Sequence, residues 1–306
     1  MSMASRILEE PLPKAVLDTS NTKGRLVGER IWFWILRIIN LAIVGILVII
    51  LWFLFQRGLS TALSWSFLTE MPREGMTEGG ILPAIVGTLL LTLISMIVAL
   101  PLGIGSAIYL NEYARDGWLK RSIHLATNNL AGVPSVVFGL FGMALFVKGL
   151  NFGTSLLAGG LTLALVALPV IIRTSEEALK SVPKDYRHAS LALGATRWQT
   201  IHRVVLPAGA SGIFTGSILS VGRVAGETAP ILFTAAAYFL PRLPHKLQDQ
   251  VMALPYHLYV ISTSGTQIEK SRPIAYGTAV VLLFLVLSMN LLAVFLRYRF
   301  RKGARN

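Results

Sequence analysis

Long apolar runs constrain this chain more than any other feature of its sequence. Residues 41–55 are apolar almost without a break, and residues 275–296 are nearly as uniform. A helix needs about 20 such residues to cross the ~30 Å hydrocarbon core of a bilayer. In lipid, a spanning segment must satisfy its backbone hydrogen bonds internally, which a helix does. We therefore expect an all-α integral membrane protein.

The hydropathy pattern predicts six membrane spans. We expect them at about residues 33–56, 80–108, 123–147, 155–174, 208–237 and 274–296. Pro101 and several glycines predict a bend near the end of the second span, and Pro134 predicts a kink in the third. The fifth span is also expected to be interrupted.

Lysine and arginine are unevenly distributed among the segments between these spans. Most of them lie in the N-terminal segment, in 111–122, in 173–207 and in the C-terminal RYRFRKGAR stretch. Few lie in 57–79, 148–154 and 238–273, relative to their length. Because basic residues accumulate in cytoplasmic loops, both termini are predicted to be cytoplasmic. This topology accounts for the net charge of +13, so nucleic acid is not expected as a partner.

The pattern divides the chain into four parts. We expect a cytoplasmic tail at 1–32, a first transmembrane helix at 33–56, a core of five further spans at 80–296 with a cytoplasmic loop at 175–207, and a basic cytoplasmic tail at 297–306. The long external segment, 238–273, is expected to form short helices on the outer surface.

The loop at 175–207 carries the signals of two capped helices. Pro183 suits the first turn of a helix, and Asp185 places negative charge near its positive end. Gly194 suits the left-handed position after that helix. Thr196–Gln199 reads as a capping box that opens a second helix, which we expect Pro207 to end. A passive connection is the alternative, but the length and the caps favour a docking element for another protein.

The spacing in this hairpin resembles the EAA loop of bacterial ABC-importer permeases, in which Glu-Ala-Ala, three residues, Gly, nine residues and Ile-x-Leu-Pro follow one another. The resemblance implies a six-helix, type I (MetI-like) permease fold whose coupling-helix hairpin docks on separate ATPase subunits. The positions that inherit this ATPase-coupling role are His188, Ala189, Ser190, Gly194, Leu206 and Pro207. His188 stands where the family has glutamate, which leaves open any salt bridge made there.

Catalytic and metal-binding patterns are missing from the sequence. It holds no Gly-x-x-x-x-Gly-Lys-Ser/Thr phosphate loop, no cysteine and no metal-ligand spacing among its five histidines. We therefore expect a transport subunit rather than an enzyme, with no catalytic residue, metal or cofactor of its own. ATP and magnesium would be bound by the partner ATPase.

Arg223 and Glu227 form a charged pair inside the fifth predicted span. They are four residues apart and share one face of a helix. A charge at the centre of a membrane helix costs at least ~2.5–3.5 kcal/mol, so such residues usually face a bundle interior or a water-filled path. Gly226 and Pro230 predict that the helix breaks here. The alternatives are a structural ion pair and a pair at the outer edge of the membrane.

The string Arg-x-x-Gly-Glu-Thr-Ala-Pro, residues 223–230, resembles the signature of phosphate (Pst) permeases. Three further stretches resemble their PstA subunit: ILPAIVGTLLLTL (81–93), ALPLGIGSAIYLNEYA (99–114) and GVPSVVFGLFG (132–142). The sister subunit PstC shares the EAA loop and the Arg-Glu-Thr-Ala-Pro string, so PstC stays open as the alternative. The resemblance covers most of residues 80–296. It implies phosphate import along a pathway with Arg223, Glu227 and Thr228. Arg173 is a weaker candidate for the pathway exit, its alternative role being a positive-inside anchor.

The resemblance also implies an assembly in the bacterial cytoplasmic (inner) membrane. Its members would be a PstC-like homologous permease, two PstB-like ATPase subunits and an external PstS-like phosphate-binding protein. Three alternatives stay open: a permease for another oxyanion, such as sulfate or molybdate; an ion-coupled secondary transporter; and a non-transporting sensor or scaffold.

Overall fold

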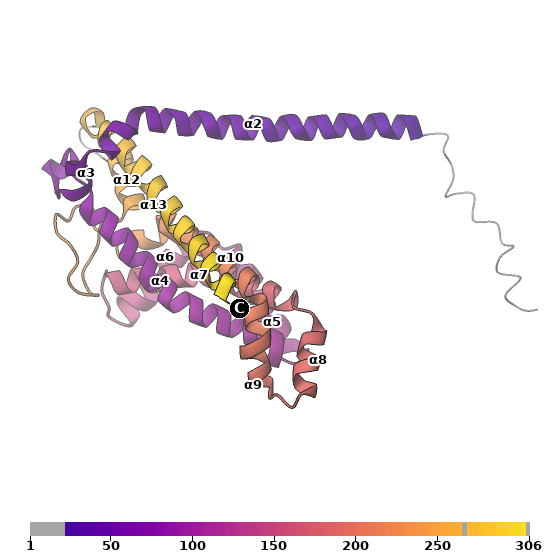
Figure 1. The fold of residues 1–306 in the computed structure, drawn as a ribbon. Coiled ribbons are helices and arrows are strands. Elements are labelled where there is room, and N and C mark those ends of the chain that lie inside the picture. The colour runs from indigo at the N-terminus through magenta and orange to yellow at the C-terminus, as the bar shows by residue number, and fades with distance from the viewer. Residues whose placement is uncertain (1–21, 265–267, 304–306) are drawn as a thin grey trace, which may run out of the picture. The chain divides into compact units, whose positions relative to one another are not determined.

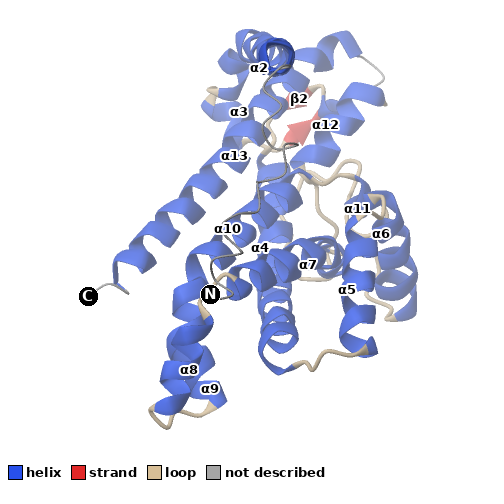
Figure 2. Cartoon of the chain, turned by 90° about the vertical axis from the view of Figure 1, so that its right-hand side faces the viewer, coloured by secondary structure: helices blue, strands red, loops and turns tan. Residues whose placement is uncertain are grey.

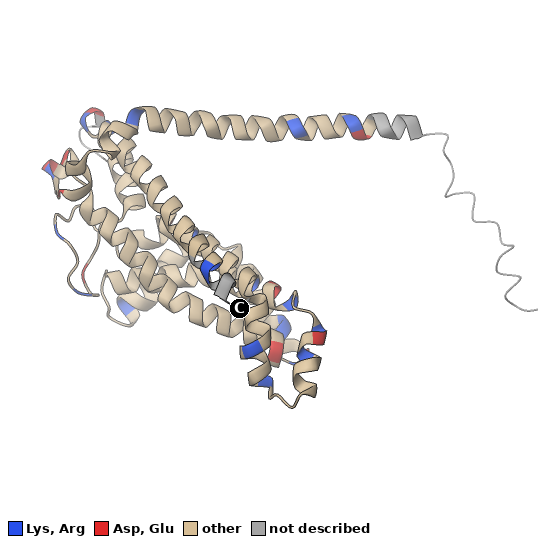
Figure 3. Cartoon of the chain, viewed as in Figure 1, with Lys and Arg blue, Asp and Glu red and all other residues tan. Residues whose placement is uncertain are grey.

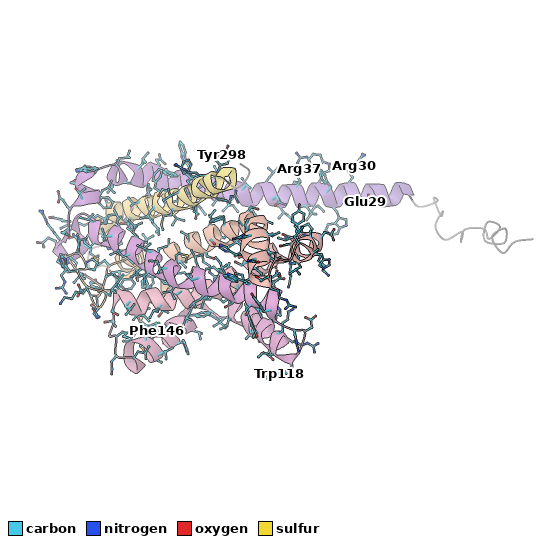
Figure 4. The ribbon with its side chains drawn as sticks, turned by 60° about the horizontal axis from the view of Figure 1, so that its bottom comes forward. Glu29, Arg30, Arg37, Trp118, Phe146 and Tyr298 are labelled. Carbon is cyan, nitrogen blue, oxygen red and sulfur yellow. The ribbon has the colours of Figure 1, made fainter. Side chains whose placement is uncertain are left out.

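The computed structural model describes residues 22–264 and 268–303, and the chain forms two compact units, 1–53 and 54–306 (Figure 1). The described part of the first unit is helical and belongs to α2 (Thr22–Ala62), which continues into the second unit. The predicted span 33–56 lies within this longer helix, and residues 22–32, expected in a tail, are helical. Residues 1–21 of that tail lie outside the described residues. Arg37 lies on α2 (Figure 4). Its guanidinium lies over the rings of Phe33 and Trp34.

The second unit is a helical bundle with one small two-stranded sheet (Figure 2). After α2 its elements are α3 (Trp65–Thr69), β1 (Pro72–Arg73), η3 (Glu74–Met76), β2 (Glu78–Gly79), α4 (Leu82–Ile108), the π-helical turn η4 (Tyr109–Tyr113), α5 (Trp118–Ala131), α6 (Ser135–Gly142), the π-helical η5 (Met143–Gly149), α7 (Leu156–Lys180), α8 (Lys184–Ala192), α9 (Arg197–Thr200), the π-helical turn η6 (Ile201–Val205), α10 (Leu206–Gly226), α11 (Ala229–Leu232), α12 (Leu254–Thr263) and α13 (Ile268–Gly303). Strands β1 and β2 pair antiparallel, with Pro72 opposite Gly79. Residues 297–303, expected in the basic tail, continue α13.

Among the described residues, five helices are long and apolar enough to cross a membrane. They are Gly28–Ala62, Leu82–Tyr113, Leu156–Lys180, Arg197–Gly226 and Glu269–Arg299. The third predicted span, 123–147, is instead a pair of helices that meet at an angle of 106° between Ala131 and Ser135, and counting this pair as one span gives six. Pro134 has no N–H to donate and disfavours helix in the residue before it, so the chain turns there. The expectation of a single kinked helix was wrong at this position.

Helices α4, α7 and α10 form the centre of the bundle. One buried cluster joins them, and its members include Leu91, Met96, Ala99, Leu163, Ala167, Ile171 and Val224. The approach is close because small residues stand at the contacts: a Cβ added at Gly160 of α7 would lie 2.5 Å from Ile94 Cγ2, and one at Gly103 of α4 would lie 2.5 Å from Ile171 Cγ2. Close packing through small residues is the usual basis of helix association in lipid.

Helices α7 and α10 run antiparallel in a register that their contacts define. Along α10, Gly209 and Gly212 lie against Ala178, and Gly216 lies against Thr174. Continuing this register by two turns places Arg223 at the level of Ala167. Val224, the next residue of α10, is buried in the cluster that also contains Leu163, Ala167 and Ile171 of α7.

Helix α12 differs from the expectation for segment 238–273. It was expected on the outer surface, but Leu254, Val260 and Ile261 are buried in a cluster with residues of α2, α3, α4 and α13. The backbone N–H of Leu254 donates to Thr88 Oγ1 of α4 at 2.8 Å. The segment is apolar on more than one face, so the bundle covers it rather than leaving it exposed.

Candidate functional site

The hairpin of α8 and α9, hereafter the hairpin (residues 183–200), is built from local signals (Figure 2). Helix α8 begins after Pro183, and the chain turns at Gly194 with φ +83°. The capping box is present: Gln199 N donates to Thr196 Oγ1 at 3.3 Å, and Thr196 N donates to Gln199 Oε1 at 2.8 Å. The predictions for both helix starts and for the turn are confirmed.

The second helix of the hairpin does not end at Pro207, contrary to expectation. It runs from Arg197 through Gly226 as one 30-residue helix. The π-helical turn η6 comes immediately before the proline, and the N–H of Leu206 donates to the carbonyl of Ile201, five residues back. Wider turns of this kind accommodate a residue that cannot donate its own hydrogen bond. The hairpin is therefore continuous with α10, and Leu206 and Pro207 lie inside a helix.

The outer surface of the hairpin carries large apolar side chains. Leu193, beside the turn, is 89% exposed, and Tyr186, Leu191 and Trp198 are also exposed. Trp198 stacks on His202, with ring centroids 6.0 Å apart. Acidic and basic residues gather around this end of the bundle (Figure 3). An apolar patch rimmed by charge is typical of a protein-binding surface.

The residues expected to couple to an ATPase lie in different environments. Ala189 and His188 are exposed, and His188 makes no hydrogen bond or ion pair with any residue the structure describes. Ser190 is half-buried and its Oγ lies 2.9 Å from Thr200 Oγ1, so it fastens the two helices together. Gly194 has open space beside it. Arg187, which no sequence motif indicated, lies inward and binds Glu112 on η4. No local signal predicts a contact between positions this far apart.

The Arg223–Glu227 pair lies where α10 ends. Arg223 Nε donates to Glu227 Oε1 at 3.3 Å, and the side chains are 43% and 15% exposed. The helix ends at Gly226, Glu227 is extended, and its N–H donates to the carbonyl of Val224. Because the helix ends here, its other last carbonyls have no partner within the helix, as at the broken helices that line transport sites. The predicted interruption of the fifth span is confirmed.

The depth of this pair follows from the register of α7 and α10. The apolar part of α7 runs from Leu156 to Ile172, and its middle lies at Ala164. Arg223 is level with Ala167 and so lies near that middle rather than at an end.

The face of α10 that carries Arg223 is not covered by the rest of the chain. Thr215, Leu219 and Arg223 recur every four residues along it, and all three are exposed. Arg297 of α13 donates to Thr215 Oγ1 at 2.7 Å near one end of this stripe. A guanidinium this exposed at mid-membrane depth is costly in lipid. The stripe therefore faces another protein or an aqueous path.

Thr228 and Arg173 lie on either side of this arrangement. Thr228 is half-buried between α10 and α11, and its carbonyl accepts from Leu232 N at 3.2 Å. Arg173 pairs instead with Glu177 on its own helix, Nε to Oε1 3.3 Å, with both side chains exposed. Arg173 lies about 10 Å from the level of Arg223 along the helix axis, since Thr174 is opposite Gly216. The structure does not bring Arg173 to the pair.

Helix α11 ties the break after Gly226 to the break at Pro134. A Cβ added at Gly139 of α6 would lie 2.9 Å from the carbonyl oxygen of Ala229 and 3.1 Å from Cα of Pro230. The two interrupted segments therefore pack on each other beside the charged pair. In the described part of the chain, no three His, Asp or Glu side chains are grouped so that they could hold a metal ion.

Residues 99–306 match the family of binding-protein-dependent transport system inner membrane components. The chain belongs to this family. One relative is the phosphate transport system permease protein PstA 1 of Mycobacterium tuberculosis. It is 33% identical to this chain over 97% of the chain and 96% of its own length. The probable ABC transporter permease protein YqgI of Bacillus subtilis is 35% identical over 82% of this chain and 88% of its own length.

Solved structures of ABC transporters share the fold of this chain. The inward-facing methionine transporter MetNI matches with a TM-score of 0.57 at 18% identity, over 71% of this chain and 94% of the matched chain. A bacterial ABC transporter involved in the import of alginate matches with a TM-score of 0.56 at 17% identity, over 88% of this chain and 99% of the matched chain. The expectation of a MetI-like permease fold is confirmed.

Proposed function

We propose that this chain is a PstA-like permease subunit of an ATP-driven phosphate importer. The proposal rests on the Arg223–Glu227 pair, held near mid-membrane depth at a broken helix and on a face that the chain leaves uncovered. The string around this pair resembles the phosphate-permease signature, and relatives such as PstA 1 are named for phosphate transport. A transport subunit of this kind carries no hydrolytic site of its own.

The chemistry of the pair suits phosphate. A guanidinium offers planar, paired donors to the oxygens of an oxyanion. Glu227 is mostly buried beside it, and its carboxylate accepts a hydrogen bond from a protonated oxygen. Phosphate carries such a proton near neutral pH, whereas fully ionised sulfate does not. This difference favours phosphate over sulfate or molybdate.

The uncovered surfaces suggest the partners. The stripe of Thr215, Leu219 and Arg223 would face a homologous, PstC-like permease across a shared path. The apolar surface of the hairpin would dock on one of two PstB-like ATPase subunits, which bind ATP and magnesium. An external PstS-like protein would deliver phosphate at the opposite end of the bundle. The hairpin end would then be cytoplasmic, with both termini on that side of the bacterial inner membrane.

The continuity of α9 with α10 suggests how hydrolysis would act on the site. When the ATPase subunits close, the hairpin moves with them, and the unbroken helix from Arg197 to Gly226 carries this movement to Arg223 and Glu227. A rigid helix that links a docking surface to a binding pair is a suitable element for alternating access.

The test is phosphate uptake by the complete complex in vesicles. We expect Arg223→Gln and Glu227→Gln to lower uptake by about ten- to hundredfold, since hydrogen bonds to charged groups contribute 1.5–3 kcal/mol. Arg272→Gln is the matched control, because Arg272 pairs with Glu269 at the start of α13, away from the site. Unchanged uptake in both site variants would refute the role of the pair. If unlabelled sulfate or molybdate inhibited the uptake of labelled phosphate more strongly than unlabelled phosphate does, that anion and not phosphate would be the substrate.

A further inference from the structure

Glu112 and Arg187 form the most enclosed ion pair that links the hairpin to another helix in the described part of the chain. Arg187 Nη2 lies 2.8 Å from Glu112 Oε1, and its Nε lies 3.2 Å from both carboxylate oxygens. The side chains are only 17% and 11% exposed. Enclosed, multidentate contacts between guanidinium and carboxylate are directional as well as strong.

The same guanidinium also binds the last turn of α7 and the linker that follows it. Arg187 Nη1 donates to the carbonyl of Val182 at 2.8 Å, and Nη2 donates to the carbonyl of Leu179 at 2.9 Å. On the acidic side, Asn111 Nδ2 donates to Glu112 Oε1 at 2.6 Å and holds the carboxylate in place. One side chain of α8 is therefore fastened to the end of α7 and to η4, the continuation of α4.

The position of this contact matters for movement. Helix α8 reaches α10 through the turn at Gly194 and the continuous helix that starts at α9. It reaches α4 through Glu112, because η4 continues α4 without a break to Tyr113. Helix α4 packs closely on α7 and α10, in the cluster that also holds Val224 beside Arg223.

We infer that the Glu112–Arg187 pair is the link through which movement of the docked hairpin reaches α4, so that α4 and α10 move together. This inference rests on the proposed function. The continuous helix acts directly on α10. The packing of α4 against α7 and α10 is apolar and non-directional, whereas the ion pair fixes the position of α4 relative to the hairpin. Arg187 and Glu112 are positioning residues, because neither lies at the Arg223–Glu227 pair.

The test uses the complete complex, purified with its ATPase subunits and reconstituted in vesicles. Glu112→Gln keeps the size of the side chain and removes its charge, and Arg187→Gln removes the donor fork. Both variants should retain wild-type amounts of bound ATPase, because the exposed surface of the hairpin is unchanged. Phosphate uptake per ATP hydrolysed should fall about tenfold. The double variant should be no worse than either single variant, as expected for two halves of one contact.

Exchanging the two charges tests whether Glu112 and Arg187 act through their contact with each other or are each needed for another reason. Glu112→Arg combined with Arg187→Glu should recover part of the uptake that each reversal alone abolishes. Glu269→Gln and Arg272→Gln form the matched control, since this exposed ion pair lies at the start of α13. Wild-type coupling in both single variants would overturn the inference. The inference would also be overturned if the variants lost bound ATPase to the same extent as they lost phosphate uptake. The pair would then serve only to keep the hairpin folded for docking.

A distance measurement tests the link without using phosphate. The chain has no cysteine, so spin labels can be placed at Lys184→Cys on α8 and Leu102→Cys on α4 without background from this chain. With the link intact, the distance between the labels should stay narrow and unchanged when ATP binds. With Glu112→Gln it should broaden and shift on ATP binding. A distance that is equally narrow in both would overturn the inference, whereas a complex that moves as expected but imports no phosphate would refute only the proposed substrate.

Discussion

Gly222 of α10 lies directly against the side-chain amide of Asn290 on α13. A Cβ added at Gly222 would stand 2.8 Å from Asn290 Nδ2 and 2.9 Å from Oδ1. Asn290 Oδ1 is buried and has no hydrogen-bond partner among the residues the structure describes. The missing side chain of glycine thus gives a polar amide room beside Arg223, in a mostly apolar stretch of α13.

We expect Gly222→Ala to disturb the site by pushing Asn290 away. Distances of 2.8–2.9 Å are well below normal contact, and backbone or side chain must shift in a packed interface. Phosphate uptake should fall several-fold, and Asn290→Ala in the same chain should restore part of it by making room. Gly105→Ala is the control, because nothing lies within 4 Å of its added Cβ and uptake should not change.

Gly194 should be required for its backbone conformation rather than for the space beside it. Its φ is +83°, and nothing lies within 4 Å of an added Cβ. A left-handed conformation costs other residues roughly 1–2 kcal/mol, least for asparagine. We expect Gly194→Asn to keep near-normal amounts of co-purified ATPase and Gly194→Val to lose most of it. Equal loss in both variants would indicate a steric contact with the partner instead.

The exposed apolar side chains of the hairpin should carry much of the docking energy. Leu193→Ser and Trp198→Ala each remove a large side chain that the chain itself leaves uncovered. Residues of this kind often contribute about 2 kcal/mol or more to binding, so ATPase affinity should fall about tenfold or more. Thermal stability of the isolated chain should stay unchanged. Leu63→Ser, at an exposed position in the turn after α2, serves as the control for lost apolar surface.

The parts of the hairpin that depend on neighbouring residues could be predicted from the sequence. The capping box at Thr196 and Gln199 and the left-handed turn at Gly194 each rest on backbone preferences within one turn of helix. The break beside Glu227 was predictable for the same reason, since Gly226 and Pro230 lie close by. Uniformly apolar runs located most of the spans, because their length alone decides whether they can cross a bilayer.

Features that depend on packing could not be predicted in this way. Pro134 predicted a kink, but its angle of 106° depends on how α6 packs against α11. Pro207 predicted a helix end, but a π-helical turn absorbed the missing donor and let the helix continue. Arg187 and Glu112 are 75 residues apart and meet only because α8 folds back beside η4. No local pattern carries that information.

His257 should make the stability of the chain depend on pH. It lies on α12, is 2% exposed, and neither ring nitrogen has a hydrogen-bond partner in the described part of the chain. Burial lowers its pKa from 6.5 to about 4, because the charged imidazolium is poorly solvated there. Well above pH 6.5 the ring is neutral in both the folded and unfolded states, so it contributes nothing to the pH dependence there.

Below pH 6.5 the unfolded chain binds a proton that the folded chain does not, so stability should fall as the pH falls toward 4. The full difference corresponds to about 3 kcal/mol. We expect the melting temperature of the wild type in detergent to drop between pH 7 and pH 5 more steeply than that of His257→Phe, which has no titrating group. His245→Gln, at an exposed position, should keep the wild-type slope. Parallel curves for the wild type and His257→Phe would mean that His257 has a polar partner and titrates normally.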